Sequence, residues 1–288
     1  MTATMANDSG SSEEARQSDE ANDVSSAFER TVSEGEQRLD RTWPGLVATG
    51  FVGGIDVGFG VFAQLIVREA TKSELLGAVA FSIGFIAVTL ANSELFTEDF
   101  LVPIVALVAG RSTVRQLVRL WSVTLLLNLI AGWVLTGLTI SGFPKYHHVA
   151  IEIGRHYSDI GLGWQSFAAA LLGGAILTLM TWMERSTPSV PGKLVAVFVV
   201  GFVVAAAPLN HVVVTSQEMF SALQAGAPFG YVDWLGVAAW SALGNVIGGV
   251  ALVTGLRLVQ VGAPKVGEER EAGGRPARPQ SVDTGTTD

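Results

Sequence analysis

Long runs of apolar residues fill the middle of the 288-residue chain, and polar segments flank them on both sides. A helix that crosses the roughly 30 Å hydrocarbon core of a membrane needs about 20 predominantly apolar residues. Four runs meet this requirement with one crossing each, at residues 43–67, 114–141, 163–184 and 234–260. The pattern therefore predicts four continuous transmembrane helices.

Two further apolar runs are longer than one crossing and contain polar residues in their middle. Residues 75–110 are interrupted by the polar stretch 92–99, and residues 193–225 are interrupted at Asn210 and His211. A single straight helix of either length would overshoot the hydrocarbon core. Non-helical backbone at membrane depth is tolerated only where protein or a water-filled cavity surrounds it. We therefore predict an all-α integral membrane protein with six transmembrane helices, of which the second and fifth are broken.

A sequence repeat divides the six predicted helices into two halves. Asn128 begins Asn-Leu-Ile-Ala-Gly in the third helix, and Asn245 begins Asn-Val-Ile-Gly-Gly 117 positions later in the sixth. Thr97 and Thr215, in the two broken helices, are 118 positions apart. Three helices per half give the halves opposite topology, which is the inverted-repeat architecture of many transport proteins. The site is then expected near the bilayer midplane, where the broken helices meet.

The polar segments at the two ends are expected to be disordered. Residues 1–41 are acidic and rich in serine, and residues 261–288 are polar and rich in glycine. Neither segment has enough large apolar side chains to offset the entropy of ordering. The expected organisation is a transmembrane domain at residues 42–260 between two disordered tails.

Charge predicts how this domain is oriented. An even number of crossings puts both termini on one side, and that side would carry 14 of the 18 lysines and arginines. Positive charge accumulates on the cytoplasmic side of membrane proteins. The sequence therefore predicts a multi-pass protein of the cytoplasmic membrane with both termini in the cytoplasm.

Composition excludes several function classes. Only 15% of the residues are charged, compared with about 25% in soluble domains. Because cysteine is absent, disulfides, thiolate metal sites and a cysteine nucleophile are excluded. No basic stripe suggests nucleic acid, and neither G-x-S-x-G nor H-E-x-x-H occurs. We expect no enzyme, no cofactor and no metal; His147, His148 and His156 fall in the predicted outer loop, where solvated side chains are expected.

The restart of each broken helix carries residues typical of a helix N-terminus. Thr215 and Glu218 have the spacing of a capping box, and Thr97 is followed by the acids Glu98 and Asp99. We therefore expect half-helices that begin at Thr97 and Thr215. Their free N–H groups and positive dipole ends would converge near the midplane and favour an anion.

Three ionisable residues inside the predicted helices or breaks are candidates for a role in transport. His211 lies in an otherwise apolar segment; an ionisable group is costly there, which favours a functional role, and histidine exchanges protons near neutral pH. Asp56 lies near the centre of the first helix, either as a hydrogen-bonded structural carboxyl or as a proton relay. Glu94 would either line the first break as a relay or, as we prefer, pair with the freed backbone amides.

These motifs resemble those of the formate/nitrite transporter family. The first break, Ala91-Asn-Ser-Glu-Leu-Phe-Thr97, is similar to that family's small-small-acid-Leu-Phe-Thr loop, and Gly244-Asn-Val-Ile-Gly-Gly249 is similar to its sixth-helix motif. The resemblance covers about residues 42–260. It implies an aquaporin-like six-helix protomer in the lipid bilayer and a homopentamer with one pore per protomer. It also implies a small monovalent anion of a weak acid as substrate, such as formate or nitrite, with protons as partners.

The resemblance also implies roles for individual residues. Leu95 and Phe96 would form part of a constriction, Thr97 would contact the substrate, and His211 would be the proton-donating group.

Several other residues of this chain align with pore positions of the family, but some of them are of a different residue type. Phe85 and Val204 fall near the constriction positions of the two halves, although the family often has an aromatic residue where Val204 stands. Asn210 replaces a common acid, and Thr215 replaces an asparagine. The lysine that some members place before the fourth helix is missing near Ser158.

Two other function classes stay open at this point. One is an aquaporin-like pore for a small neutral solute, which the extra acids Glu98 and Asp99 near the first break would allow. The other is a membrane-anchored interaction protein that acts through its acidic tail, which would leave the pore-lining histidine unexplained.

The cysteine-free background allows a direct test of orientation. A single cysteine at Ser112, within the basic segment 111–119, should not react with a membrane-impermeant thiol reagent added to whole cells, whereas one at Lys145 should react. Reaction at position 112 would overturn this topology.

Overall fold

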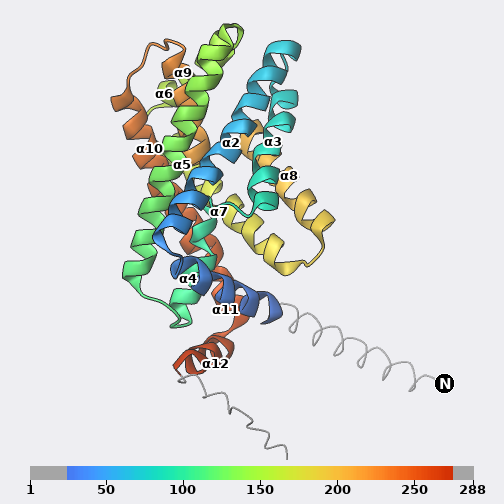
Figure 1. The fold of residues 1–288 in the computed structure, drawn as a ribbon, viewed down its shortest axis with the longest axis vertical. Coiled ribbons are helices and arrows are strands. Elements are labelled where there is room, and N and C mark those ends of the chain that lie inside the picture. Colours follow the sequence, from blue (N-terminus) through green and yellow to red (C-terminus); the bar gives the residue numbers. More distant parts are fainter. Residues whose placement is uncertain (1–24, 275–288) are drawn as a thin grey trace, which may run out of the picture.

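The computed structural model describes residues 25–274, and all regular structure in this range is helical (Figure 1). Five of these helices are long and apolar enough to cross a membrane: α2 (Trp43–Thr71), α3 (Glu74–Ala91), α5 (Val114–Gly142), α7 (Trp164–Ser186) and the continuous segment Tyr231–Val261. That last segment consists of α10 (Tyr231–Val246), the π-helical η3 (Ile247–Thr254) and α11 (Gly255–Val261). The shorter apolar helix α8 (Val190–Ala206) provides the remaining crossing. The predicted all-α membrane architecture is confirmed.

Both predicted breaks are present. α3 ends at Ala91, and Asn92 then takes a left-handed conformation with φ 52°, which asparagine adopts more readily than most residues. The chain continues through the 3-10 turn η1 (Glu98–Phe100) into α4 (Val102–Val108). After α8, residues 207–211 are non-helical and lead into α9 (Val212–Gln224). The second and fifth crossings therefore each consist of two helical pieces joined by irregular backbone.

Glycines let the helices approach until their backbones touch. A side chain on Gly54 would collide with Asn128 of α5, and one on Gly174 would collide with Asn245 of α10. A side chain on Gly248 would meet the backbone of α7. The GxxxG spacings of this chain therefore serve helix packing rather than chemistry.

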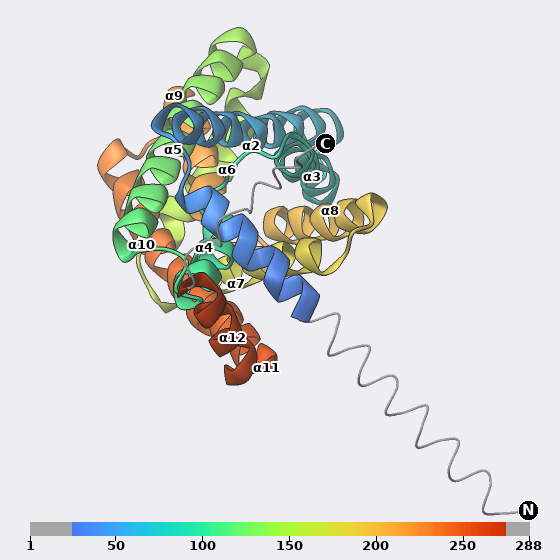
Figure 2. The same cartoon turned by 60° about the horizontal axis from the view of Figure 1, so that its bottom comes forward.

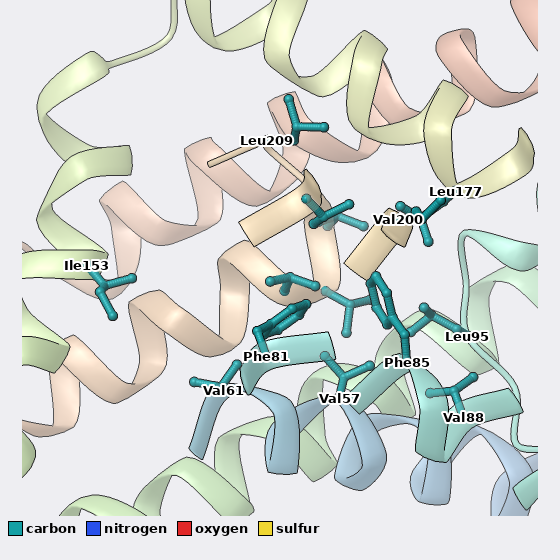
Figure 3. Packing of buried hydrophobic residues seen from close by; sticks show 14 of the residues in the cluster. Val57, Val61, Phe81, Phe85, Val88, Leu95, Ile153, Leu177, Val200 and Leu209 are labelled. Carbon is teal, nitrogen blue, oxygen red and sulfur yellow. The ribbon is translucent and has the colours of Figure 1, made fainter. Parts of the chain in front are cut away.

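The hydrophobic core lies where α3 and α8 face each other beside the breaks. Figure 3 shows Phe81 and Phe85 of α3 close to Leu95 of the first break, with Val200 of α8 above them. The Ser82 hydroxyl also joins the two helices, because it donates to the carbonyl of Phe198 at 3.0 Å. This packing holds the two breaks against one another.

The N-terminal segment differs from its prediction as a disordered tail. Residues 25–39, called here the N-terminal helix, are helical, and Phe28 and Val32 are buried against Leu101 and Val105. Figure 2 shows this helix (blue) lying across the end of the bundle where α4, α11 and α12 also lie. The prediction was wrong because the segment has only a few apolar residues at helical spacing, and the many acids and serines around them give it the overall composition of a disordered tail. Residues 1–24 lie outside the described range.

The C-terminal segment also differs from its prediction. α12 (Ala263–Gly274) follows α11. Lys265 contacts Glu29 of the N-terminal helix at 2.6 Å, and Glu269 contacts Arg111 at 3.0 Å. These ion pairs, together with Val266, which packs against the apolar cluster of Phe28, place this helix. Residues 275–288 lie outside the described range.

The segment predicted as an outer loop is structured as well. It forms the 3-10 turn η2 (Pro144–Tyr146) and the helix α6 (His147–Ile160), which packs against α9. The ring of His147 contacts the Ile140 carbonyl at 3.0 Å. Within residues 25–274, no cluster of three or more His, Asp or Glu side chains could hold a metal ion.

The contact of the N-terminal helix depends on one aromatic side chain. Because Phe28 is fully buried, Phe28→Ala should lower the free energy of local unfolding of residues 25–39 by about 3 kcal/mol. Hydrogen–deuterium exchange of the full-length protein measures this change, and Gln37→Ala, at an exposed position of the same helix, is the control. Equal exchange in both variants would show that Phe28 does not hold the helix in place.

Candidate functional site

An asparagine of α5 holds the first break together. Asn128 Nδ2 donates to the carbonyls of Gly50 and Glu94, at 2.7 and 3.0 Å, and its Oδ1 accepts from Phe96 N at 3.0 Å. One buried side chain thus satisfies a donor and an acceptor that the break has freed. At membrane depth such groups would otherwise cost several kcal/mol each.

An asparagine of α10 does the same for the second break. Asn245 Nδ2 donates to the carbonyls of Ala170 and Asn210, at 2.7 and 2.8 Å, and its Oδ1 accepts from Val212 N at 2.8 Å. The two halves therefore share one hydrogen-bonding scheme, as the inverted repeat predicted.

The scheme corrects the register of the repeat at the breaks. Its members Glu94 and Asn210, and likewise Phe96 and Val212, lie 116 positions apart, not 118. The match of Thr97 with Thr215 is therefore wrong. Leu95 corresponds to His211, so one half has an apolar side chain where the other has an imidazole.

His211 lies at the start of α9 and is completely buried. Its Nδ1 accepts from the Val214 amide at 3.3 Å, so the neutral ring carries its proton on Nε2. That nitrogen lies 2.6 Å from Thr97 Oγ1, to which it donates. The ring of Phe85 packs edge-on with a centroid distance of 6.1 Å. Residues of both breaks therefore meet inside the protein, away from lipid.

The predicted helix starts need correction. α9 begins at Val212, one turn before Thr215, because the imidazole of His211 acts as the N-cap in place of a hydroxyl. Thr215 lies inside the helix, and Glu218 accepts from the Tyr157 hydroxyl at 2.6 Å instead of closing a capping box. In the first half, Thr97 precedes η1 without capping it, and α4 begins only at Val102.

The backbone amides expected to receive an anion are largely occupied. Phe96 N and Val212 N donate to the two asparagines, and Val214 N donates to His211. The Thr215 hydroxyl at the junction is buried and has no hydrogen-bond partner among the described residues.

The predicted constriction residues lie in one buried cluster. Leu95, Phe96, Phe85 and Val204 are all buried there, and Figure 3 shows Leu95 next to Phe85. Phe96 also packs edge-on against Phe100, with ring centroids 5.0 Å apart. An apolar collar of this kind surrounds the pair of Thr97 and His211.

The acids of the first break pair with arginines in and just after the N-terminal helix. Arg38 lies 3.1 Å from Asp99, 3.4 Å from Glu98 and 3.7 Å from Glu94, and Glu94 also pairs with Arg41. Burial lowers the pKa of Arg38, but the surrounding carboxylates raise it by more, so its pKa lies well above the usual range. The Glu94 side chain is thus engaged in ion pairs rather than with the freed amides, and the extra acids Glu98 and Asp99 share Arg38 as their partner.

Asp56 contacts the first break directly. The Ser93 hydroxyl donates to Asp56 Oδ2 at 2.6 Å. This contact matches the structural alternative for Asp56; a relay role stays a prediction.

Two cavities lead towards the junction from opposite ends. The N-terminal vestibule, about 620 Å³, lies beside the N-terminal helix, and Arg38, Asn92, Glu94, Glu98 and Lys193 are among its lining residues. The distal vestibule, about 440 Å³, reaches from exposed residues of α3 and α6 to Pro208 at the end of α8, and Glu218 lines it. The sequence analysis did not identify Arg38 or Tyr157 as site residues, and it did not place Glu218 in a cavity. Of these, only Glu218 could have been indicated from the sequence, by its spacing from His211 along α9.

The fold and the junction define a class of protein: a multi-pass membrane protein of two inverted halves, whose broken helices meet around a buried polar pair, as in channels and transporters. The family model described as "Formate/nitrite transporter" matches residues 25–259. The chain belongs to the formate/nitrite transporter family, as its motifs predicted, and is therefore a transport protein rather than an enzyme.

Individual relatives agree with this assignment. The "Uncharacterized transporter YrhG" of Bacillus subtilis is 26% identical, over 78% of this chain and 88% of that protein. The "Formate channel BtFdhC" of Bacillus thuringiensis is 24% identical, over 78% of this chain and 90% of that protein. Among solved structures, an "FNT family ion channel" has a TM-score of 0.70 at 18% identity, over 79% of this chain and 96% of that one. A "Pentameric formate channel with formate bound" has a TM-score of 0.62 at 23% identity, over 73% and 94%.

The asparagine anchors generate a stability prediction. Asn245→Ala removes three buried hydrogen bonds and leaves their backbone partners unsatisfied, so it should lower the free energy of unfolding by about 3 kcal/mol. Denaturant unfolding in detergent micelles, followed by tryptophan fluorescence, measures the loss. Gln224→Ala also removes an amide that donates to a carbonyl, but at an exposed position, and should cost less than about 1 kcal/mol. Equal losses in the two variants would contradict the anchoring role.

Proposed function

We propose that this protein carries small monovalent anions of weak acids, of the formate and nitrite class, across the cytoplasmic membrane, and that His211 gives each anion a proton on the way. The observation that supports this most is the 2.6 Å contact between Thr97 and His211, which joins the two breaks in the apolar collar. Relatives that are formate channels supply the substrate class.

The physical reason for a proton at this point is the cost of burying charge. An anion that enters the collar loses its hydration, and an unpaired charge in an apolar medium is far more expensive than a neutral acid. The nearby negative charge favours the protonated imidazolium, which gains its second proton at Nδ1 and releases the Val214 amide. The imidazolium then gives its Nε2 proton to the anion, and the neutral acid crosses the apolar residues.

The assembly and orientation follow from the family and from charge. A solved structure of similar fold is a pentameric formate channel, and we propose a homopentamer with one pathway in each protomer. The N-terminal vestibule would face the cytoplasm. It is lined by the N-terminal helix, which lies at the same end of the bundle as α12 (Figure 2), and this end carries most of the basic residues.

A pore for small neutral solutes is the second candidate. The acids at the first break favour it, but Arg38 pairs with both Glu98 and Asp99 and two relatives of this chain are formate channels, which leaves the anion pathway as the better explanation. Glycerol uptake separates the two candidates in the same assay.

His211 gives the decisive variant. His211→Asn keeps a residue suited to the N-cap of α9 but removes proton exchange, so the protein should assemble normally and lose the pH dependence of transport. Uptake of labelled formate, nitrite and glycerol into proteoliposomes, with and without a pH gradient, measures this effect. His147→Asn, whose ring contacts only the Ile140 carbonyl near the protein surface, is the control. A parental rate and pH profile in His211→Asn would show that this histidine is structural.

A further inference from the structure

A buried carboxylic acid lies at the inner end of the distal vestibule. Glu218 is only 2% exposed, yet it lines this cavity together with Ala205 and Ala206 at the end of α8 and Pro208 in the second break. The cavity therefore connects Glu218 with the exposed rim on one side and with the break on the other.

Glu218 has no ion-pair partner among the described residues. The cation nearest to it, Arg68, is 2.9 Å from Glu74 and 3.0 Å from Glu152, two exposed carboxylates of the rim. The hydrogen bonds that Glu218 accepts come from neutral groups: the Tyr157 hydroxyl donates to its Oε2 at 2.6 Å, and the side-chain amide of Gln64 also bonds to the carboxyl. An uncompensated carboxylate at this depth is costly, and such residues mark ion or proton pathways in membrane proteins.

A neighbouring acceptor lacks a donor that a protonated Glu218 would provide. Gln64 lies beside the Glu218 carboxyl, and its buried Oε1 has no hydrogen-bond partner among the described residues. A neutral carboxyl has one O–H donor, and a carboxylate has none. Protonation of Glu218 would therefore allow the Gln64 amide to turn, so that its Oε1 accepts the new O–H while Tyr157 continues to donate to the other oxygen.

Glu218 lies on the same face of α9 as His211. His211, Thr215 and Glu218 are spaced by four and three residues, which places them in one row along the helix. Seven residues of helix span about 10 Å. Midway, the Thr215 hydroxyl lies beside the Tyr157 phenol but has no hydrogen-bond partner in the described protein. This row connects the distal vestibule to the histidine, which is itself closed to solvent.

We propose that Glu218 is a proton-relay site, which transfers protons between the distal vestibule and His211. The O–H bond of Glu218 breaks, the proton moves along vestibule water and the Thr215 hydroxyl, and an N–H bond forms on His211. The carboxylate left behind, held by the Tyr157 hydroxyl, takes a new proton from water in the vestibule. This proposal rests on the proposed function for its cargo, but the protonation of Glu218 does not depend on which anion is carried.

The charged groups around Glu218 set the pH response of this step. α6 contributes Tyr157, His156, Glu152, Arg155 and Asp159; α2 contributes Arg68, and α3 contributes Glu74. α5 and α10 also pack against α9 but bring no charged side chain into the distal vestibule within the described residues. Arg68 pairs with Glu74 and Glu152, and Arg155 pairs with Asp159. Glu218 is therefore the carboxyl of this cavity without an ion-pair partner among the described residues, and its protonation changes the buried end of the cavity.

The test compares two carboxylates of the same vestibule in the full-length protein. Glu218→Gln removes the buried acid, and Glu152→Gln, at a side chain 53% exposed, removes an equal charge from the rim. In proteoliposomes with an inward pH gradient, Glu218→Gln should slow formate uptake about tenfold or more and make it insensitive to the pH on the distal side. Glu152→Gln should keep the parental pH profile. Because both groups act on one path, Glu218→Gln combined with His211→Asn should be no slower than the slower single variant.

A parental pH profile in Glu218→Gln would overturn the proposal, and so would equal effects of the two glutamine variants. If Glu218→Gln does not assemble, Tyr157→Phe takes its place. This variant keeps the acid but removes the hydrogen bond to its charged form, so the pH profile should shift to higher pH; an unshifted profile would overturn the relay.

A second readout does not depend on transport. Infrared difference spectra between acid and neutral pH should show a protonated-carboxyl band that is absent in Glu218→Gln and present in Glu152→Gln. If the parent carries neither formate nor nitrite, the proposed function is wrong, and the infrared band alone then tests whether Glu218 gains and loses a proton. If no band depends on Glu218, the proposal that it is a proton site is wrong.

Discussion

Irregular backbone in the middle of a membrane has to find hydrogen-bond partners within the protein, and this requirement governs the structure. Asn128 and Asn245 meet it with the same three bonds in the two halves. Glycines opposite each asparagine allow the helices to come close enough for these bonds. Because the breaks are held rigidly, His211, which directly precedes α9, can place its imidazole against Thr97 of the other half of the chain.

Charge is treated differently at the two ends of the pathway. At the N-terminal vestibule, Arg38 and Arg41 pair with the acids that flank the first break. This contact also explains why the N-terminal helix is ordered where composition indicates a tail. At the distal vestibule, Glu218 has no ion-pair partner among the described residues and is held by a phenol and an amide. Neutral partners leave this acid free to gain and lose a proton, which is the physical basis of the relay proposed above.

Much of the candidate site could be predicted from the sequence, and the predictions that were wrong have physical reasons. Apolar run lengths gave the crossings, and a polar interruption within an overlong run gave each break. Asn128 and Asn245 were matched correctly because they lie in continuous helices, where sequence spacing equals structural spacing. Thr97 and Thr215 were mismatched because the loops of the two breaks differ in path, so letters that align need not occupy equivalent places. The capping box at Thr215 failed because an imidazole already capped the helix.

The sequence by itself determined the membrane class, the six crossings, the two breaks and the family, since all of these depend on local properties: hydrophobic length, polar interruption and short motifs. Only the tertiary structure decided the pairing of Thr97 with His211, the ion pairs of Arg38 with the first break, and the unpaired state of Glu218. Each of these joins segments that are distant in the chain, or depends on which cations and donors are within reach. No local pattern encodes such distances, because they follow from how the helices pack around the breaks.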